Sequence, residues 1–501
     1  MLLPALLAPA LDELALRLDP EGDGPCHLHL VALTGRLLCG GGWAAGHRCA
    51  GAEPLATGRA GAYDESTVRK AARSLTAQGA VAVAEDLLQK QVHRATGKAS
   101  VEAFTDLYDQ VYWTKKNAWA APVGSLGNRL LACVYFGMTF VRPEDGPCLA
   151  YHVSWHKPAS PLLDAVQVLH GDERRHRWLL QHVSVHILDR GTQGDPALSW
   201  MLEQGIPYLT LAQRSVQWKR YRSPTHHTPS GVPIFDRPDE RLHEAVMGID
   251  GRITEPRVVI FPARPEQGDD NGRAVVYRTA ATLSGEQLEE LDGTYKARWP
   301  NNENPIKALV AVGFGCNLDR TLAPTTSRGH DGQVARLEQA IAEHDDKLAK
   351  WPEPTTSKEA KKRATEEKRR ANKETKLAAV QRGTEEKGSR VDEGAERLCK
   401  VLTLLLWNAL ALLLWKSPVE AVRTMTLGRV CDLLVRQSAL AVVEAERVTL
   451  WVEAVGSVED RGHQAEVVRL VNEARLRVRG SVLRVKIRDP AGKQQVVRVS
   501  A

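Results

Sequence analysis

Residues 99–210 alternate between strand-like and helix-like segments, and this alternation restricts the fold more than any other feature of the chain. Three β-rich segments come first, at 101–113, 128–141 and 148–155. The following segments predict an amphipathic helix, a strand, a helix and a strand, at 161–180, 183–189, 196–204 and 206–212. Strands that alternate with helices in this way predict an α/β protein with a mixed sheet.

Three acidic residues suggest a catalytic site in this frame. The order of strands and helices is that of a ribonuclease H-like fold, in which the first and fourth strands are neighbours. Asp106 in the first strand and Asp189 at the end of the fourth then converge, and Glu303 on a later helix closes the site. Carboxylates are the hard ligands that Mg²⁺ prefers. Two such ions can drive phosphodiester chemistry.

The first acid has a competitor, because Asp109 follows Asp106 by three residues. The two positions have opposite parity, so on one regular strand they face opposite sides. We favour Asp106, which lies nearer the middle of the strand. A lone strand aspartate is more often a solvated residue or a turn former, so the hypothesis depends mainly on the sequence around Glu303.

That sequence, YKARWPNNENPIKAL from Tyr295 to Leu309, resembles the Y-R-E-K signature of bacterial insertion-sequence transposases of the DDE class. The segments FTDLYDQVYWTKK and HILDRGTQGDPALSWMLEQGIPYLTLA are similar to the family's two aspartate segments, and the resemblance covers roughly residues 63–325. It implies that Asp106, Asp189 and Glu303 are the catalytic metal ligands. It also implies DNA-binding roles for the signature residues Tyr295, Arg298 and Lys307, with Arg298 and Lys307 holding phosphates. Arg190, next to Asp189, is expected to bind a phosphate or to pair with the acids.

Two departures from the family pattern lie close to Glu303. The spacing from Arg298 to Glu303 is one residue longer than in the usual signature. Pro305 follows Glu303 by two residues, and proline is tolerated only in a first helical turn. A helix should therefore begin close to Glu303. Trp299 is expected to be a core or helix-packing residue rather than a DNA contact.

Changes in composition suggest seven segments. The first, 1–62, is of unclear fold and its scattered Cys and His residues have irregular spacing, which disfavours a zinc site. A helical, possibly DNA-binding segment follows at 63–98, then the first part of the core at 99–210 and a mainly β insertion at 211–283. The glutamate helix lies in 284–333, and a charged helical or disordered arm covers 334–396. An apolar helix and the C-terminal region, 397–501, are expected to complete the core. The arm is either simply solvated, which we favour, or a DNA-gripping or dimerising element.

Bulk properties are compatible with a cytoplasmic, nucleoid-associated bacterial protein. The formal charge of +6 permits a nucleic-acid partner without requiring one. Eight dispersed cysteines indicate free thiols in a reducing compartment. The N-terminus lacks a basic leader and is a poor secretory signal. The apolar run Val401–Trp415 is shorter than a membrane span, so we expect a buried core helix and no membrane association.

The leading hypothesis is therefore a cut-and-paste DNA transposase that uses two Mg²⁺ ions, for which Mn²⁺ can substitute. Its partners would be the terminal inverted repeats, target DNA and a second copy of the chain, with the N-terminal helices and the charged arm binding the repeats. One alternative is a ribonuclease H-like nuclease that performs no strand transfer. The other is a catalytically inactive transposase derivative that only binds DNA.

Overall fold

The computed structural model describes most of the chain. The described residues are 2–22, 24–37, 52–112, 122–126, 129–156, 162–189, 194–212, 224–227, 233–239, 242, 246–247, 253–254, 256–261, 275–281, 285–314, 320–325, 330–354, 356–381, 386–435 and 437–488. They form two compact units. The first comprises residues 1–110, 135–319 and 393–501, and the second comprises 111–134 and 320–392.

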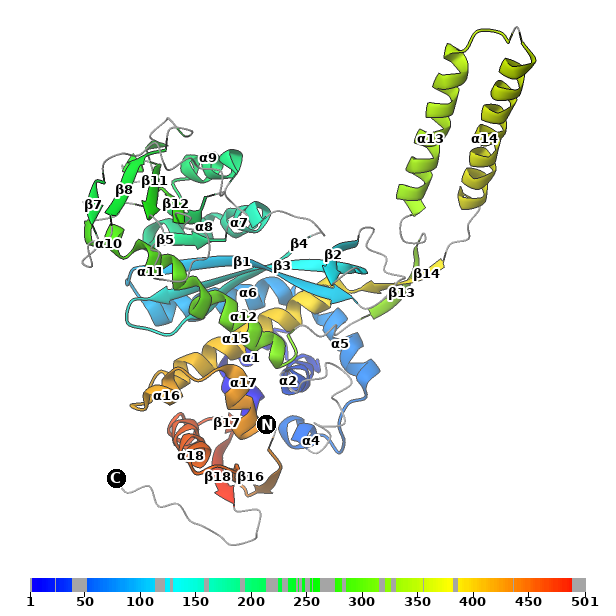
Figure 1. Ribbon diagram of the computed structural model, residues 1–501. Coiled ribbons are helices and arrows are strands. Elements are labelled where there is room, and N and C mark those ends of the chain that lie inside the picture. Colours follow the sequence, from blue (N-terminus) through cyan, green and yellow to red (C-terminus); the bar gives the residue numbers. More distant parts are fainter. Residues whose placement is uncertain are drawn as a thin grey trace. The chain divides into compact units, whose positions relative to one another are not determined.

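A mixed sheet forms the centre of the first unit, so the expected α/β class with a mixed sheet is confirmed (Figure 1). Its strand order is β4-β3-β1-β5-β6-β12-β11-β8-β7. The first five strands are the five expected from sequence: β1 Val101–Tyr112, β3 Arg129–Pro143, β4 Leu149–His156, β5 Val183–Leu188 and β6 Tyr208–Leu211. β5 runs parallel to both β1 and β6, whereas β3 and β4 are antiparallel to each other. Parallel neighbours need crossover connections, and helices supply them here.

Three helices make these crossovers. α7 (Leu162–His170) and α8 (Glu173–His182) lie between β4 and β5, and α9 (Asp195–Glu203) lies between β5 and β6. The expectation of one helix over 161–180 was wrong. The chain breaks at Gly171, and Asp172 then caps α8 by accepting a hydrogen bond from the Arg175 amide at 2.9 Å.

The mainly β segment after β6 extends the same sheet. β12 (Val275–Thr279) is antiparallel to β6, followed by β11 (Arg257–Phe261), β8 (Pro233–Pro238) and β7 (His226–His227). A separate pair lies off this sheet, β9 (Val246–Met247) with β10 (Ile253–Thr254). Buried Arg278 on β12 binds Asp239 at 2.6 Å and Asp195 of α9 at 2.7 Å. This ion-pair network ties the inserted strands to a crossover helix.

The apolar run near residue 400 belongs to α15 (Glu393–Leu414), a 22-residue helix. It is longer than we expected and reaches the length of a membrane span. However, 72% of its apolar window is buried inside the protein. It packs against β4 and against two N-terminal helices, α5 (Glu65–Ala77) and α6 (Ala80–Thr96). These two helices are therefore part of the same packed unit as the sheet.

Further helices and strands complete the first unit. The remaining N-terminal helices are α1 (Leu2–Leu18), α2 (Cys26–Arg36) and α4 (Ala52–Thr57). The C-terminal elements are α16 (Glu420–Arg423), α17 (Leu427–Val430), a π turn at Cys431–Val435 and α18 (Val458–Glu473). They accompany a four-stranded sheet of β15 (Ala439–Val443), β16 (Arg447–Glu453), β18 (Ser481–Arg488) and β17 (Arg477–Val478).

Side-chain amides complete strand backbones at two places. Asn408 of α15 accepts a hydrogen bond from the Ala150 amide at 2.7 Å and donates one to the Ala150 carbonyl at 2.8 Å. β4 lies at the end of the sheet order, so Asn408 takes the place of a neighbouring strand. Asn472 of α18 pairs in the same way with Val485 of β18, at 2.8 and 2.9 Å. Both amides satisfy backbone groups that would otherwise lack partners.

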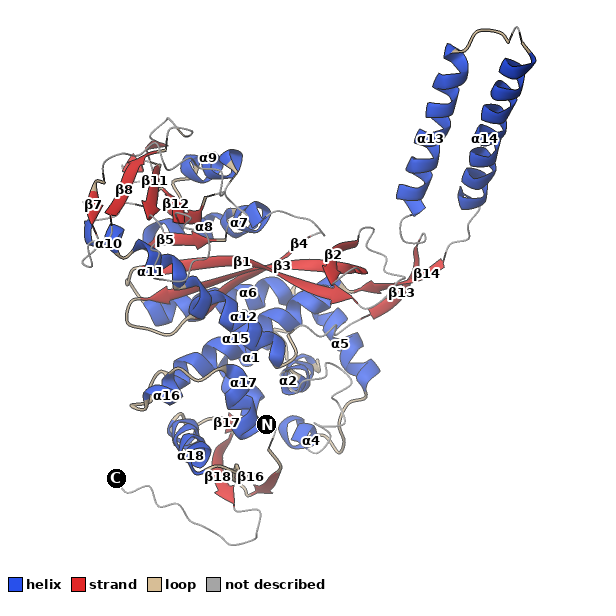
Figure 2. Cartoon of the chain, viewed as in Figure 1, coloured by secondary structure: helices blue, strands red, loops and turns tan. Residues whose placement is uncertain are grey.

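The second unit contains a helical hairpin and short strand pairings (Figure 2). β2 (Pro122–Leu126) pairs with the first residues of β3, and β13 (Arg320–Thr325) pairs with β14 (Glu386–Val391). Between β13 and β14 the chain forms α13 (His330–Lys350) and α14 (Ser357–Gln381), which pack against each other. In its described part the charged arm is therefore mainly helical, and it ends in the strand β14.

Replacing Asn408 should destabilise the first unit. Asn408→Ala leaves a buried N–H and a buried C=O of Ala150 without their partner, and each orphaned group costs about 1–3 kcal/mol. We expect a loss of about 2–4 kcal/mol in the free energy of unfolding, measured by denaturant titration. Exposed Asn372→Ala on α14 is the matched control and should leave stability nearly unchanged. Equal effects of the two substitutions would contradict this account.

Candidate active site

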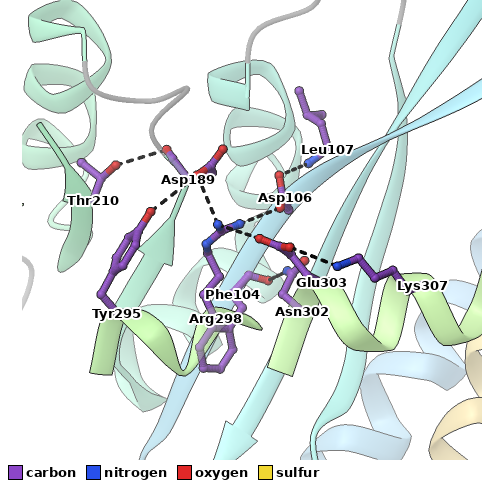
Figure 3. A network of polar contacts seen from close by, with 10 residues as sticks. All are labelled: Phe104, Asp106, Leu107, Asp189, Thr210, Tyr295, Arg298, Asn302, Glu303 and Lys307. Atoms are coloured by element: carbon purple, nitrogen blue, oxygen red, sulfur yellow. Dashed lines mark hydrogen bonds and ion pairs between the residues drawn. The ribbon is translucent and has the colours of Figure 1, made fainter. Parts of the chain in front are cut away.

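Asp106 and Asp189 converge because their strands are parallel neighbours. The last paired residues of β1 and β5 are Thr105 and Leu188, so each aspartate lies one residue beyond that pair. Asp106 shares the face of β1 that holds Phe104, which is packed with Ile187 of β5 in one buried cluster. Figure 3 shows both carboxylates on this side of the sheet.

Glu303 comes from a helical segment that crosses the same face. The segment consists of α10 (Gly285–Glu289), α11 (Leu291–Lys296), a π turn at Trp299–Glu303 and α12 (Asn304–Ala311). Leu288, Leu291 and Tyr295 join the buried cluster of Phe104. This apolar packing fixes the segment against the sheet and brings Glu303 to the two aspartates.

The π turn explains the extra residue between Arg298 and Glu303. In a π turn the hydrogen bond spans five residues instead of four, and the Asn304 amide accordingly donates to the Trp299 carbonyl. Residues five apart therefore share a face, as residues four apart do in an α-helix. Arg298 and Glu303 meet at 2.8 Å. Pro305 lies in the first turn of α12, as expected from its missing N–H.

The guanidinium of Arg298 is the centre of the site (Figure 3). It binds Asp106 at 2.9 Å, Asp189 at 3.3 Å and Glu303 at 2.8 Å. Its side chain is 7% exposed, whereas those of Asp189 and Glu303 are 42% and 28% exposed. The arginine thus lies beneath the acids. The resemblance implied phosphate binding for Arg298, but in this structure its contacts are made to the carboxylates.

The environment of Asp106 disfavours its ionised form. Burial, with smaller contributions from the negative charges of Asp189 and Glu303, raises the pKa of Asp106 to about 6. Arg298 and the Leu107 amide, which donates to Asp106 at 2.8 Å, act in the opposite direction. Burial lowers the pKa of Arg298, but the surrounding acids and Tyr295 outweigh it and raise that pKa. Burial beside charged partners, the combination found at many functional sites, is therefore the cause of the raised pKa of Asp106.

The other expected site residues differ in their placement. Lys307 is exposed and its Nζ lies 3.6 Å from Glu303, so it can reach a substrate. Tyr295, for which a DNA-binding role was expected, is only 5% exposed, and its hydroxyl lies 3.5 Å from Asp189. Arg190 and the side chain of Asp109 lie outside the described residues. Trp299 is 62% exposed, so its expected core position was wrong.

Two supporting residues were missed in the sequence. Buried Asn302 donates to the Phe104 carbonyl at 3.0 Å, which joins the π turn to β1 two residues before Asp106. Thr210 of β6 donates to the Asp189 carbonyl at 3.1 Å. Neither residue has a motif of its own. Asn302 lies within the recognised signature, but only the π turn directs it toward the sheet.

The donor set of the site suits a hard divalent cation. Three carboxylates from separate elements already surround one positive group, and oxygen donors of this type bind Mg²⁺ and Mn²⁺. Within the described residues, no three His, Cys, Asp or Glu side chains are close enough to share a metal ion as they stand. The Arg298 guanidinium lies between the carboxylates, so binding of a metal ion requires this side chain to move.

Asp106→Asn should stabilise the metal-free protein at neutral pH. The pKa of Asp106 is about 6 in the folded chain and near the ordinary aspartate value of 3.8 in the unfolded chain. The folded state therefore binds more protons between these values, and the ionised carboxylate costs stability above pH 6. We expect a gain of about 2 kcal/mol at pH 7.5 that shrinks on acidification from pH 6 toward pH 4.

Thermal unfolding in EDTA across this pH range measures the effect. Asp346→Asn, an exposed change on α13, is the control and should produce no such pH-dependent gain. A loss of stability in Asp106→Asn at pH 7.5 would show that the Arg298 contact outweighs burial.

Comparison with known proteins found no family model and no curated protein that matches this chain.

Proposed function

We propose that this protein is a DDE transposase with a ribonuclease H-like core that cleaves DNA and transfers its strands. One observation carries the proposal. Asp106, Asp189 and Glu303 come from two parallel strands and a distant helix, and they meet around one cation at 2.8–3.3 Å. Carboxylate oxygens that converge in this way are the hard ligands that Mg²⁺ prefers, and two such ions can drive phosphodiester chemistry.

The topology supports the ribonuclease H-like assignment. The core order β4-β3-β1-β5-β6, with helices between β4 and β5 and between β5 and β6, is the arrangement that places the acids of β1 and β5 side by side. The inserted strands extend the sheet from β6 before the chain returns with Glu303. The resemblance to insertion-sequence transposases implies an insertion at this position.

Asp106, Asp189 and Glu303 would hold two Mg²⁺ ions, which supply Lewis-acid charge beside the reacting phosphodiester. Several residues of the chain position this set. Tyr295 and Thr210 hold Asp189 from two sides, and Asn302 fixes the π turn to β1. Exposed Lys307 can contact a DNA phosphate beside Glu303. Arg298 balances the carboxylates until the substrate complex forms.

Substitution of single acids should abolish cleavage. With a labelled duplex that carries the DNA flanking the coding sequence, the chain should nick at a fixed position in Mg²⁺ but not in EDTA. Asp189→Asn and Glu303→Gln should each lower the rate by at least about a hundredfold, because each removes a ligand charge. Glu286→Gln on α10 is exposed and is the matched control, which should cleave normally.

Three other outcomes would redirect the proposal. Full cleavage by Asp189→Asn would exclude the triad. Cleavage without joining to a second DNA would favour the nuclease alternative. Binding without cleavage in either Mg²⁺ or Mn²⁺ would favour an inactive DNA-binding derivative, consistent with an Arg298 that never leaves the acids.

A further inference from the structure

The helical hairpin has two helices of opposite charge. α14 carries nine Lys and Arg residues against four Glu, which gives +5, whereas α13 carries three basic against five acidic residues, which gives −2. The acids of α14 are engaged within the hairpin. Glu366 pairs with His344 at 2.8 Å and with Arg369 at 3.2 Å, and Glu367 and Glu374 pair with Arg363 and Arg370.

These pairs leave one face of α14 strongly basic. The face contains six exposed residues at helical spacing, together with the uncharged Thr365 and Asn372. We call it the basic face, and its members are Lys358, Lys361, Lys362, Lys368, Arg369 and Lys376. It contains no acidic residue. Its five lysines form no ion pair with any described residue, because the glutamates of α14 lie on the other sides of the helix.

The chemistry of the basic face fits a polyanion with evenly spaced charges. From Lys358 to Lys376 the helix rises about 27 Å, at 1.5 Å per residue. The same length of duplex DNA contains about eight base pairs, with one phosphate charge per about 1.7 Å. Lysine binds phosphate as a flexible point charge, and phosphate contacts position a protein on DNA without carrying sequence information.

Other uses of this face are less consistent with the hairpin. A dimerising coiled coil needs a seam of large apolar residues, but the exposed residues of α14 are charged, polar or alanine. A membrane-surface helix needs apolar residues beside the lysines. Trp351 lies between the two helices of the hairpin in the sequence, and the Nζ of Lys362 lies over its ring, 4.9 Å from the ring centre. This ring is therefore partly covered by a charged side chain.

We infer that the basic face of α14 binds the phosphate backbone of double-stranded DNA without reading its sequence. The inference rests on the proposed function for the choice of DNA as the polyanion. It assigns the arm a role in holding the duplex, separate from the chemistry at Asp106, Asp189 and Glu303.

The test uses the full chain and a labelled random-sequence duplex of about 30 base pairs in EDTA, with salt varied from roughly 50 to 200 mM. Fluorescence anisotropy gives the affinity and its salt dependence. The variant Lys358→Gln/Lys361→Gln/Lys368→Gln/Lys376→Gln should reduce the slope of log K against log salt by about 3.6, at about 0.9 per phosphate contact. Affinity at the lowest salt should fall at least about tenfold.

A matched pair of double variants controls for net charge. Lys361→Gln/Lys368→Gln should reduce the slope by about 1.8, whereas Arg336→Gln/Lys350→Gln on α13 should leave it unchanged. Equal effects of the two pairs would overturn the inference. The inference would also be overturned if the quadruple variant lost binding to phosphatidylserine vesicles but bound DNA normally. The same holds if the quadruple variant dissociated from dimer to monomer in sedimentation velocity but bound DNA normally.

These measurements distinguish failure of this inference from failure of the proposed function. Because EDTA removes the metal ions, cleavage plays no part in the binding assay. A chain that binds DNA through the basic face but never cleaves it would retain this inference and lose the transposase proposal. If the chain cleaves DNA but the quadruple variant keeps the same slope of log K against log salt, the transposase proposal survives and this inference fails.

Discussion

The contact of Arg298 with three carboxylates is the interaction around which the candidate site is organised. Carboxylates brought together on one face repel one another, and burial adds to the cost of their charge. The guanidinium offsets this cost from below, with bonds of 2.9, 3.3 and 2.8 Å to Asp106, Asp189 and Glu303. The compensation is incomplete, since the pKa of Asp106 remains raised to about 6. A cation bound by these carboxylates would relieve the remaining electrostatic cost.

The rest of the first unit holds the elements that carry these residues. Apolar packing of Leu291 and Tyr295 against Phe104 fixes the glutamate segment on the sheet. The π turn adds one residue to a helical turn, so Arg298 and Glu303, which are five residues apart, lie on one face. At the far edge of the core, Asn408 of α15 closes β4 with two hydrogen bonds. The backbone of Ala150 in β4 thus has its partner, while the acids at the site stay partly exposed.

The two units divide the proposed work. The first contains the carboxylates and their supporting residues, whereas the hairpin of the second contains neutralised acids and a face of lysines. In both units, charged side chains are balanced by oppositely charged side chains of the same unit. At the site, one arginine balances several acids, and on α14 the glutamates are matched within the hairpin so that the lysines remain available. In the proposed function the carboxylates would hold metal ions and the lysines would bind DNA phosphates.

The sequence by itself determined the order of strands and helices, the three acids and the basic character of the arm. It did so because period-2 and period-3.6 patterns, and runs of charge, are local properties of the chain. Only the tertiary structure decided which groups meet. The extra residue between Arg298 and Glu303 is accommodated by the π turn, which keeps both side chains on one face. The burial of Tyr295 and Arg298, the exposure of Trp299 and the strand-like pairing of Asn408 depend on contacts between residues up to 258 apart, which no local pattern encodes.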